Sequence, residues 1–172
     1  MRLLVVRHAR AESAKAFAET GMDDDLRPLT DDGRERMRQG AAGLHRLVDE
    51  IDILATSPLV RARQTAEIIA AEYGGLSALE VDELRPRGSP ADLAGWLRDA
   101  GAQETIAIVG HETQLQELVG WLLTGRKDAI VEIKKGGAVM LEVHVRGDHA
   151  VKAGSATLLW SLAPRQLRLL GG

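Results

Sequence analysis

The first ten residues constrain this chain more than any other stretch. They read Met-Arg-Leu-Leu-Val-Val-Arg-His-Ala-Arg, an apolar run that ends abruptly at charged and imidazole side chains. A short run of Leu and Val is typical of a strand buried on both faces of a parallel sheet. In such sheets ligands bind beyond the carboxyl ends of the strands, which is where Arg7 and His8 stand. Taken alone, the stretch is equally consistent with a first strand that simply emerges into solvent.

Two later stretches repeat this arrangement of buried strand, polar turn and helix. One strand is expected over residues 51–55, and Ser57-Pro58 after it predicts the N-cap and the first residue of a helix. Arg61 would lie in the first turn of that helix. A second strand is expected over residues 105–109, followed by Gly110-His111 and a further helix.

The side chains that follow these three strands are expected to converge, because parallel strands end at the same edge of a sheet. They are two arginines, two histidines and a serine: Arg7, His8, Ser57, Arg61 and His111. A planar guanidinium binds two oxygens at once and helix N-termini favour anions, so the set suits a tetrahedral dianion such as phosphate. Each residue also has a simpler interpretation. Arg61 could be a surface arginine, and the two histidines could be bonded to nearby backbone.

The rest of the chain predicts one α/β domain over residues 1–172 with a mostly parallel sheet. Thr30 is expected to cap a helix whose first turn is acidic. Gly147-Asp148 is expected to form the turn between a strand over residues 138–145 and a return strand over residues 156–162.

Composition excludes several kinds of function. The chain has 172 residues, a formal net charge of −3 and no cysteine. Its charge gives no general attraction to nucleic acid or to an anionic membrane, and without cysteine it has no thiol chemistry, disulfide or cysteine-ligated zinc. The apolar start is too short for a signal peptide, and no segment approaches the length of a membrane span. We therefore expect a soluble, cytoplasmic protein with neither nucleic acid nor membrane as a partner.

Three motifs resemble those of the histidine phosphatase superfamily. They are Arg7-His8-Ala9 after the first strand, Ser57-Pro58-Leu59-Val60-Arg61-Ala62-Arg63-Gln64-Thr65 after the second, and Gly110-His111 after a later one. Arg27-Pro28-Leu29-Thr30 and Glu83-Leu84 also resemble the small bacterial phosphohistidine phosphatases of that superfamily. The resemblance implies a doubly wound, phosphoglycerate mutase-like α/β fold with helices on both faces. It also implies metal-independent phosphoryl transfer through a phosphohistidine.

The residues and the resemblance together predict a mechanism. His8 is the expected nucleophile, because neighbouring arginines would lower its pKa and keep the imidazole unprotonated. Arg7 and Arg61 would hold the phosphate oxygens, and His111 would donate a hydrogen bond to the same group. Two further side chains are expected to bind the substrate: Arg27 and Ser57. Neither a metal nor another cofactor is expected.

The sequence favours phosphohistidine on a protein, as in a phosphorelay, as the substrate. Larger members of the superfamily carry an acidic proton donor in a Leu-x-Glu pattern, but this chain has Leu84-Arg85-Pro86 there, which leaves Glu83 as the candidate acid. A protonated phosphohistidine departs as neutral imidazole and needs an enzyme acid less than an alkoxide does. Residues 73–104 also offer little material for a lid, so we expect an open site with arginines at its rim that steer an acidic partner.

Several other functions stay open. The runner-up is a phosphatase for small phosphomonoesters such as nucleotides or sugar phosphates, while a mutase is disfavoured by the short chain. A non-catalytic phosphate-binding module would keep the arginines but gains little from His8. A metallohydrolase built on His8, His111 and carboxylates is disfavoured because the arginines would repel the cation and no two histidines have helical ligand spacing beside an acidic residue.

Overall fold

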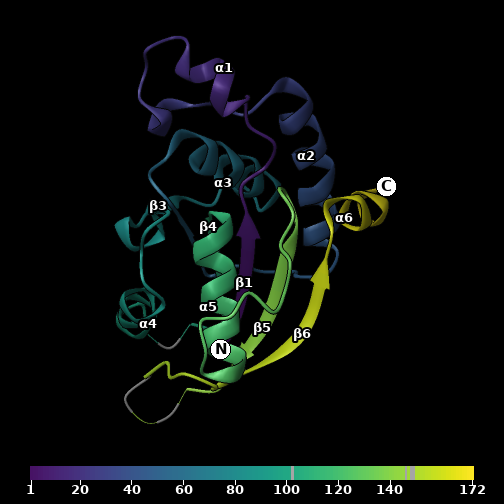
Figure 1. Cartoon of the computed structure of the whole chain (residues 1–172). Coiled ribbons are helices and arrows are strands. Elements are labelled where there is room, and N and C mark those ends of the chain that lie inside the picture. Colours follow the sequence, from purple (N-terminus) through teal and green to yellow (C-terminus); the bar gives the residue numbers. More distant parts are fainter. Residues whose placement is uncertain (102, 146, 148–149) are drawn as a thin grey trace.

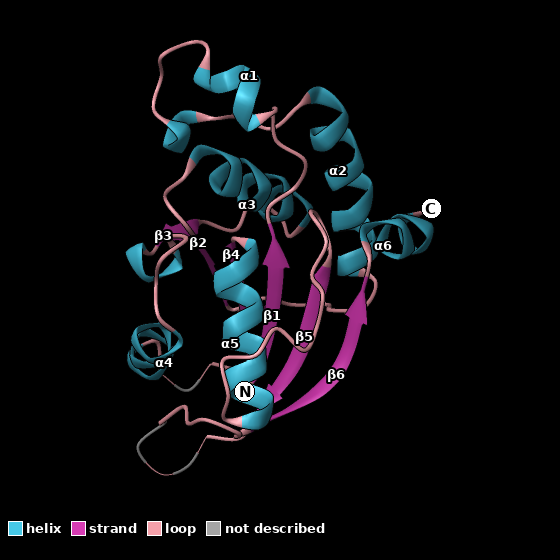
Figure 2. Cartoon of the chain, viewed as in Figure 1, coloured by secondary structure: helices cyan, strands magenta, loops and turns pink. Residues whose placement is uncertain are grey.

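The computed structural model describes residues 1–101, 103–145, 147 and 150–172. In this part of the chain six strands form one sheet in the order β3-β2-β4-β1-β5-β6. The strands are β1 (Arg2–Arg7), β2 (Ile53–Thr56), β3 (Ala78–Glu80), β4 (Thr105–Gly110), β5 (Ala138–Val143) and β6 (Ala156–Leu162). The first four strands of that order run parallel. At one edge β5 pairs antiparallel with β1, and β6 pairs antiparallel with β5. The predicted mostly parallel sheet is therefore confirmed (Figure 2).

Helices cover both faces of this sheet (Figure 1). They are α1 (Ala14–Ala18), α2 (Asp31–His45), α3 (Val60–Glu72), α4 (Pro90–Asp99), α5 (Glu112–Thr124) and α6 (Pro164–Gly171), with 3₁₀ turns η1 (Asp24–Leu26) and η2 (Asp82–Leu84). Buried side chains of α2, α3 and α6 form one core with the sheet, and those of α4 and α5 form a second core on the other face. The fold is thus doubly wound, as expected. Within the described ranges, no helix has both the length and the apolar character needed to cross a membrane.

The central strand β1 explains why the chain opens on an unbroken apolar run. Leu4 and Val6 pack into the core formed with α2, α3 and α6, while Leu3 and Val5 pack into the core formed with α4 and α5. All four side chains are fully buried. Burying one such side chain contributes about 1.5–3 kcal/mol, so the strand is strongly fixed and its carboxyl end is a rigid support for a site.

Helix starts were predicted correctly at one place and wrongly at another. The Thr30 hydroxyl accepts a hydrogen bond from a first-turn N–H of α2 at 3.0 Å, which confirms the predicted cap. Ser57-Pro58 does not begin α3, which starts at Val60 after a non-bonding N-cap at Leu59. The Ser57 hydroxyl lies instead 2.9 Å from a ring nitrogen of His111, so its side chain belongs to the polar edge of the sheet and not to the helix.

The carboxyl-terminal part contains the predicted strand pair and one helix that the sequence pattern did not predict. Strand β5 pairs antiparallel with β6, although it ends at Val143 and position 148 of the predicted turn lies outside the described residues. Helix α6 follows β6 and packs on α2. Its Leu167 is fully buried, and a side chain at Gly43 of α2 would collide with the Leu167 carbonyl, so the two helices approach closely.

Candidate active site

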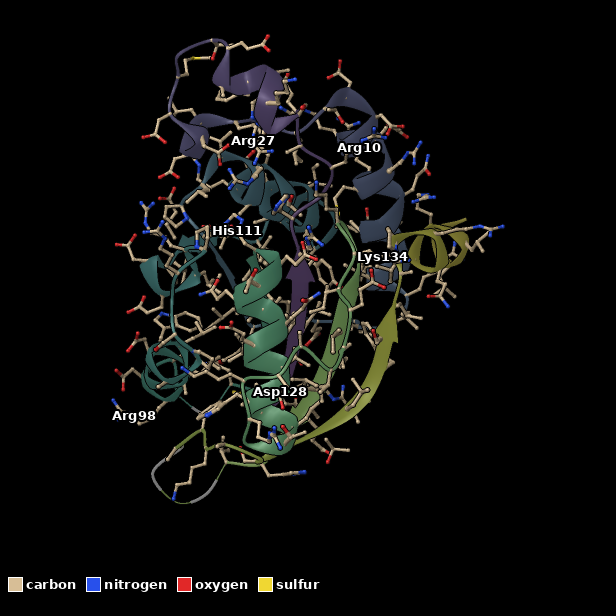
Figure 3. All side chains as sticks on the ribbon, viewed as in Figure 1. Arg10, Arg27, Arg98, His111, Asp128 and Lys134 are labelled. Atoms are coloured by element: carbon tan, nitrogen blue, oxygen red, sulfur yellow. The ribbon has the colours of Figure 1, made fainter. Side chains whose placement is uncertain are left out.

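The carboxyl ends of β1, β2 and β4 open into one cavity of about 260 Å³. Its lining residues are Arg7, His8, Arg27, Arg61, Pro86, His111, Glu112, Thr113 and Lys135. Five of the six residues singled out in the sequence therefore lie around one space, and only Ser57 is not part of its wall. Figure 3 shows His111 at this end of the sheet, with Arg27 on the side of α1.

His8 is held as a neutral imidazole of one tautomer. Its Nδ1 lies 2.8 Å from the carbonyl oxygen of Ala9. Because a carbonyl can only accept, Nδ1 carries the proton and Nε2 keeps its lone pair. Burial, assisted by the charges of Arg61 and Arg7, lowers the pKa of His8 to about 3. No hydrogen bond among the described residues engages Nε2, so the lone pair is available to a ligand.

His111 lies beside His8 and is hydrogen-bonded to Ser57. The two ring centroids are 5.2 Å apart. His111 Nε2 lies 2.9 Å from the Ser57 hydroxyl oxygen, and Ser57 is fully buried. Burial, together with the neighbouring His8, lowers the pKa of His111 to about 3. Ser57, expected to touch the substrate, is hydrogen-bonded to His111 and does not line the cavity.

Arg7 and Arg61 share an unusual hydrogen-bond pattern. Arg7 donates from Nη1 to the Ile133 carbonyl at 2.9 Å and pairs through Nη2 with Glu112 at 2.7 Å. Arg61 donates from Nη1 to the Asp24 carbonyl at 2.9 Å and pairs through Nη2 with the Asp24 carboxylate at 3.2 Å. In both residues Nε is buried and has no partner. The buried Nε of Arg63, which does not line the cavity, has no partner either, so the feature that sets Arg7 and Arg61 apart is that their guanidinium groups lie at the cavity.

Asp24 joins the two arginines that reach the cavity from outside the sheet. One carboxylate oxygen accepts from Arg27 Nε at 2.7 Å, and the other pairs with Arg61. The Arg27 hydrogen bond, with the Arg61 charge, lowers the pKa of Asp24 below its ordinary value. Asp24 is therefore a carboxylate at neutral pH, suited to hold guanidinium groups and unsuited to donate a proton. Arg27 is further anchored by the Glu12 carbonyl at 2.8 Å.

Glu83, the candidate acid from the sequence, does not line the cavity. It lies in η2, where its carbonyl accepts a hydrogen bond from the side chain of Gln114, and its side chain lines a separate surface groove beside α4. The carboxylates at the cavity are Glu112, which lines it, and Asp24, which ties two of its arginines together. Both were missed, Glu112 because it looked like the first residue of a helix and Asp24 because residues 11–25 lack clear periodicity.

Lys135 is a further cation that sequence reasoning missed. The loop that carries it is tied to the end of β1, because the Gly136 N–H lies 3.1 Å from the carbonyls of both Arg7 and His8. Burial and the nearby Arg7 lower the pKa of Lys135 below its ordinary value. The sequence signal was weak, since residues 126–137 show neither strand nor helix periodicity. The cavity thus gathers four cationic side chains, from Arg7, Arg27, Arg61 and Lys135, around two neutral imidazoles.

The geometry suits a tetrahedral dianion held without a metal. Guanidinium groups provide charge and directed N–H donors, and a bare imidazole nitrogen stands among them. Among the residues that the structure describes, no group of three or more histidine, aspartate or glutamate side chains is arranged to hold a metal ion.

Comparison with known proteins places this site in a family. Residues 3–88 match the sequence profile of the histidine phosphatase superfamily (branch 1). An uncharacterized protein of Picosynechococcus sp. (strain PCC 7002) is 35% identical over 143 residues, which cover 82% of this chain and 84% of that protein. The phosphohistidine phosphatase SixA of Escherichia coli (strain K12) is 27% identical over 173 residues and is matched over 98% of each chain.

A solved structure shows that the likeness extends to the fold. The protein histidine phosphatase SixA complexed with tungstate superposes with a TM-score of 0.79 at 23% identity, covering 97% of this chain and 99% of that one. The matched region 3–88 includes Arg7, His8, Arg27 and Arg61, and the superposition extends the likeness over nearly the whole chain. The chain belongs to the histidine phosphatase superfamily.

Proposed function

We propose that this chain is a metal-independent phosphatase that acts through a phosphohistidine on His8 and removes phosphate from phosphohistidine on a protein. The observation that carries the proposal is the unbonded Nε2 of His8 in a cavity whose wall includes Arg7, Arg27, Arg61 and Lys135. A nucleophile of this kind has no purpose in a site that only binds phosphate. The positive charges at the cavity are what a phosphoryl group would neutralise.

In the first step His8 Nε2 attacks phosphorus in line while the bond from phosphorus to the substrate nitrogen breaks. The lone pair of Nε2 forms the new bond, and the leaving imidazole takes the electrons of the old one. Positive charge develops on the His8 ring as the bond forms, and the Ala9 carbonyl that accepts from Nδ1 stabilises it. Arg7 and Arg61 bind the equatorial oxygens, where charge is spread in the transition state.

In the second step water attacks the phosphohistidine and releases His8. The new bond from oxygen to phosphorus replaces the bond to Nε2, and the proton of the attacking water leaves with phosphate or to solvent. His8 returns to its starting state without a net proton change, because its proton stays on Nδ1, hydrogen-bonded to the Ala9 carbonyl, throughout. The low pKa of the ring, about 3, favours departure as neutral imidazole.

Two features support a nitrogen leaving group over an alkoxide. Asp24 is held ionised by Arg27 and Arg61, and Glu83 lies away from the cavity. Glu112 lines the cavity but is paired with Arg7 at 2.7 Å, so none of the three is placed as the proton donor for a departing oxygen. When the substrate is a protonated phosphohistidine, its histidine leaves as neutral imidazole and needs no proton from the enzyme. The end-to-end likeness to a phosphohistidine phosphatase points the same way.

The structure also supports a large substrate. The described part of the interval 73–104, residues 73–101 and 103–104, contains only β3, η2 and α4 besides their connections, and of these residues only Pro86 reaches the wall of the cavity. An uncovered pocket cannot surround a small ligand, so binding energy has to come from surface around the phosphate.

The substrate is tested by measuring kcat/KM for a phosphohistidine protein beside a panel of nucleotides, sugar phosphates and p-nitrophenyl phosphate, with tungstate as a competing tetrahedral dianion. We expect the phosphoprotein to be preferred by orders of magnitude and tungstate to inhibit all reactions competitively. A small phosphomonoester that is turned over as efficiently as the phosphoprotein would favour the small-molecule phosphatase.

A further inference from the structure

A second cavity, of about 210 Å³, adjoins the catalytic one. Its lining residues are Ala9, Arg10, Gly33, Arg36, Met37, Lys135, Gly136, Pro164 and Arg168, and we call it the basic groove. It lies where α2 and α6 run close to each other and meet the segments after β1 and before β5 (Figure 1). The groove begins at Ala9, directly after His8, and shares Lys135 with the catalytic cavity.

The basic groove and the catalytic cavity share two backbone segments, the one that follows β1 and the loop that precedes β5. The Arg10 carbonyl accepts from the Thr30 N–H at 3.0 Å, and a side chain at Gly33 would collide with that carbonyl, so the start of α2 is pressed against the segment after β1. Gly136, at φ +76°, closes the groove on the side where its N–H is bonded to the His8 carbonyl. A group bound in the groove is therefore held at a fixed place relative to the nucleophile.

The groove carries an excess of positive charge. Four of its lining residues are cationic: Arg10, Arg36, Lys135 and Arg168. The only carboxylate paired with any of them, within the described ranges, is that of Asp32, at 2.7 Å from Arg36 and 3.6 Å from Arg10. Lys135 and Arg168 form no ion pair in the same part of the chain.

On the other side of the catalytic cavity, two of the exposed arginines are paired with carboxylates. Arg63 pairs with Glu80 at 3.3 Å. Arg85 pairs with both Asp25 and Asp82 at 2.9 Å. Arg87, next to Pro86 of the cavity wall, is exposed and has no ion pair among the described residues. The basic groove holds two cations that likewise have no ion pair in this part of the chain, Lys135 and Arg168, and they share one cavity.

The groove differs from the catalytic cavity in a way that indicates its ligand. None of its cations has a buried N–H without a partner, whereas Arg7 and Arg61 each have one. Its wall includes the buried apolar side chains of Ala9 and Met37. Such a surface suits an acidic side chain, whose methylene groups lie on the apolar wall while its carboxylate faces the cations at the rim.

We propose that the basic groove binds an acidic residue of the substrate protein that lies close to its phosphohistidine. This inference rests on the proposed function and adds a specificity determinant to it. An extended chain advances about 3.3–3.6 Å per residue, so a carboxylate within a few residues of the phosphohistidine can reach a groove that begins next to His8. Arg168 and Arg36 would then select among phosphohistidine proteins without taking part in the chemistry.

The test compares two phosphohistidine peptides that differ only in flanking residues, acidic in one and replaced by Asn and Gln in the other. Wild type is compared with Arg168→Ala, Arg36→Ala and the charge reversal Arg168→Glu. Arg38→Ala is the matched control, because Arg38 lies on α2 outside the groove and pairs with Glu35. p-Nitrophenyl phosphate reports the chemistry without any flanking contact.

We expect wild type and Arg38→Ala to prefer the acidic peptide, chiefly through KM, and the preference to weaken as salt rises. Each alanine variant in the groove should lose about two- to fivefold of that preference, the range for a partly exposed ion pair. Arg168→Glu should lose more and should favour a lysine-flanked peptide. Hydrolysis of p-nitrophenyl phosphate should stay unchanged in all of them.

The possible failures are distinguishable. If wild type hydrolyses both peptides equally, or if the groove variants keep the preference, the groove proposal is overturned while the proposed function stands. A groove variant that loses activity equally on p-nitrophenyl phosphate and on both peptides would show a structural effect and would also overturn it. If wild type hydrolyses p-nitrophenyl phosphate but neither peptide, the proposed function itself fails, and the groove proposal fails with it.

Discussion

The Nδ1 atom of His8 donates to the carbonyl oxygen of Ala9 at 2.8 Å, a contact between neighbouring residues that decides which ring nitrogen can react. The bond fixes the proton on Nδ1 and leaves Nε2 bare. Burial and two arginines keep the ring neutral. The sequence shows His8 only as a histidine that follows a strand. Its hydrogen bond and its burial make it suitable as a nucleophile.

The two depressed histidine pKa values predict how stability depends on pH. His8 and His111 have pKa values of about 3 in the folded chain against 6.5 for an ordinary histidine, so below pH 6.5 the unfolded chain binds more protons. The free energy of unfolding should therefore fall as pH drops from about 6.5 toward 4, by at most about 1.4 kcal/mol per pH unit for each histidine. Urea unfolding of wild type and His8→Asn across this range measures it. If the slope of the free energy of unfolding against pH is the same in His8→Asn, the pKa of His8 is not lowered in the folded chain.

Arg61→Ala should lower kcat by about 100- to 1,000-fold, the usual cost of removing a donor that strengthens as charge develops. Its loss removes the buried Nε and the link to Asp24 together. Arg63→Ala, on the same helix but paired with Glu80 away from the cavity, is the control and should keep full activity. Steady-state kinetics distinguish the outcomes. A normal kcat with only a raised KM would show that Arg61 binds the substrate and the transition state equally well.

Asp24 should act as a positioning residue. It holds Arg61 through both its carbonyl and its carboxylate and also accepts from Arg27, so Asp24→Ala should lower kcat roughly tenfold, as expected for losing hydrogen bonds to charged groups. Asp24→Asn should retain part of the activity, because the amide oxygen can still accept. Asp25→Asn, the neighbouring carboxylate that pairs with Arg85, is the control. Full activity in Asp24→Ala would show that the arginines are positioned without it.

Ser57→Ala tests the corrected role of this residue. Removing the hydroxyl leaves the buried Nε2 of His111 without its partner at 2.9 Å, so the ring should lose its fixed orientation. We expect a several-fold lower kcat and little change in KM, since Ser57 does not reach the cavity. A rise in KM alone would return Ser57 to the substrate contact inferred from the sequence.

Much of the fold could be predicted because it is encoded in local pattern. β1 and β4 are buried on both faces, so each is an uninterrupted apolar run that identifies a parallel strand. The polar residues that follow strands then locate the sheet edge where Arg7, His8 and His111 meet. Helix α6 was missed although Pro164 marks a helix start, because its apolar face is short and depends on contact with α2.

The parts of the site that escaped prediction lie on segments without periodicity. Asp24 and Lys135 come from loops whose course is set by long-range hydrogen bonds, such as that from the Arg61 side chain to the Asp24 carbonyl and that from Gly136 to the end of β1. Ser57 was expected to cap α3 because Ser-Pro is a common helix start, and only the packed structure shows its hydroxyl beside His111.

The most direct test of the central claim is to trap the covalent intermediate. Labelled phosphohistidine protein is mixed with the enzyme in the presence of a strong chelator, quenched within milliseconds, and the label is mapped by alkaline digestion and mass spectrometry. We expect an acid-labile, alkali-stable phosphoryl group on His8, formed without metal and absent from His8→Ala. Label on a serine or an aspartate, or a phosphoenzyme that forms only when a divalent metal is restored, would contradict the mechanism.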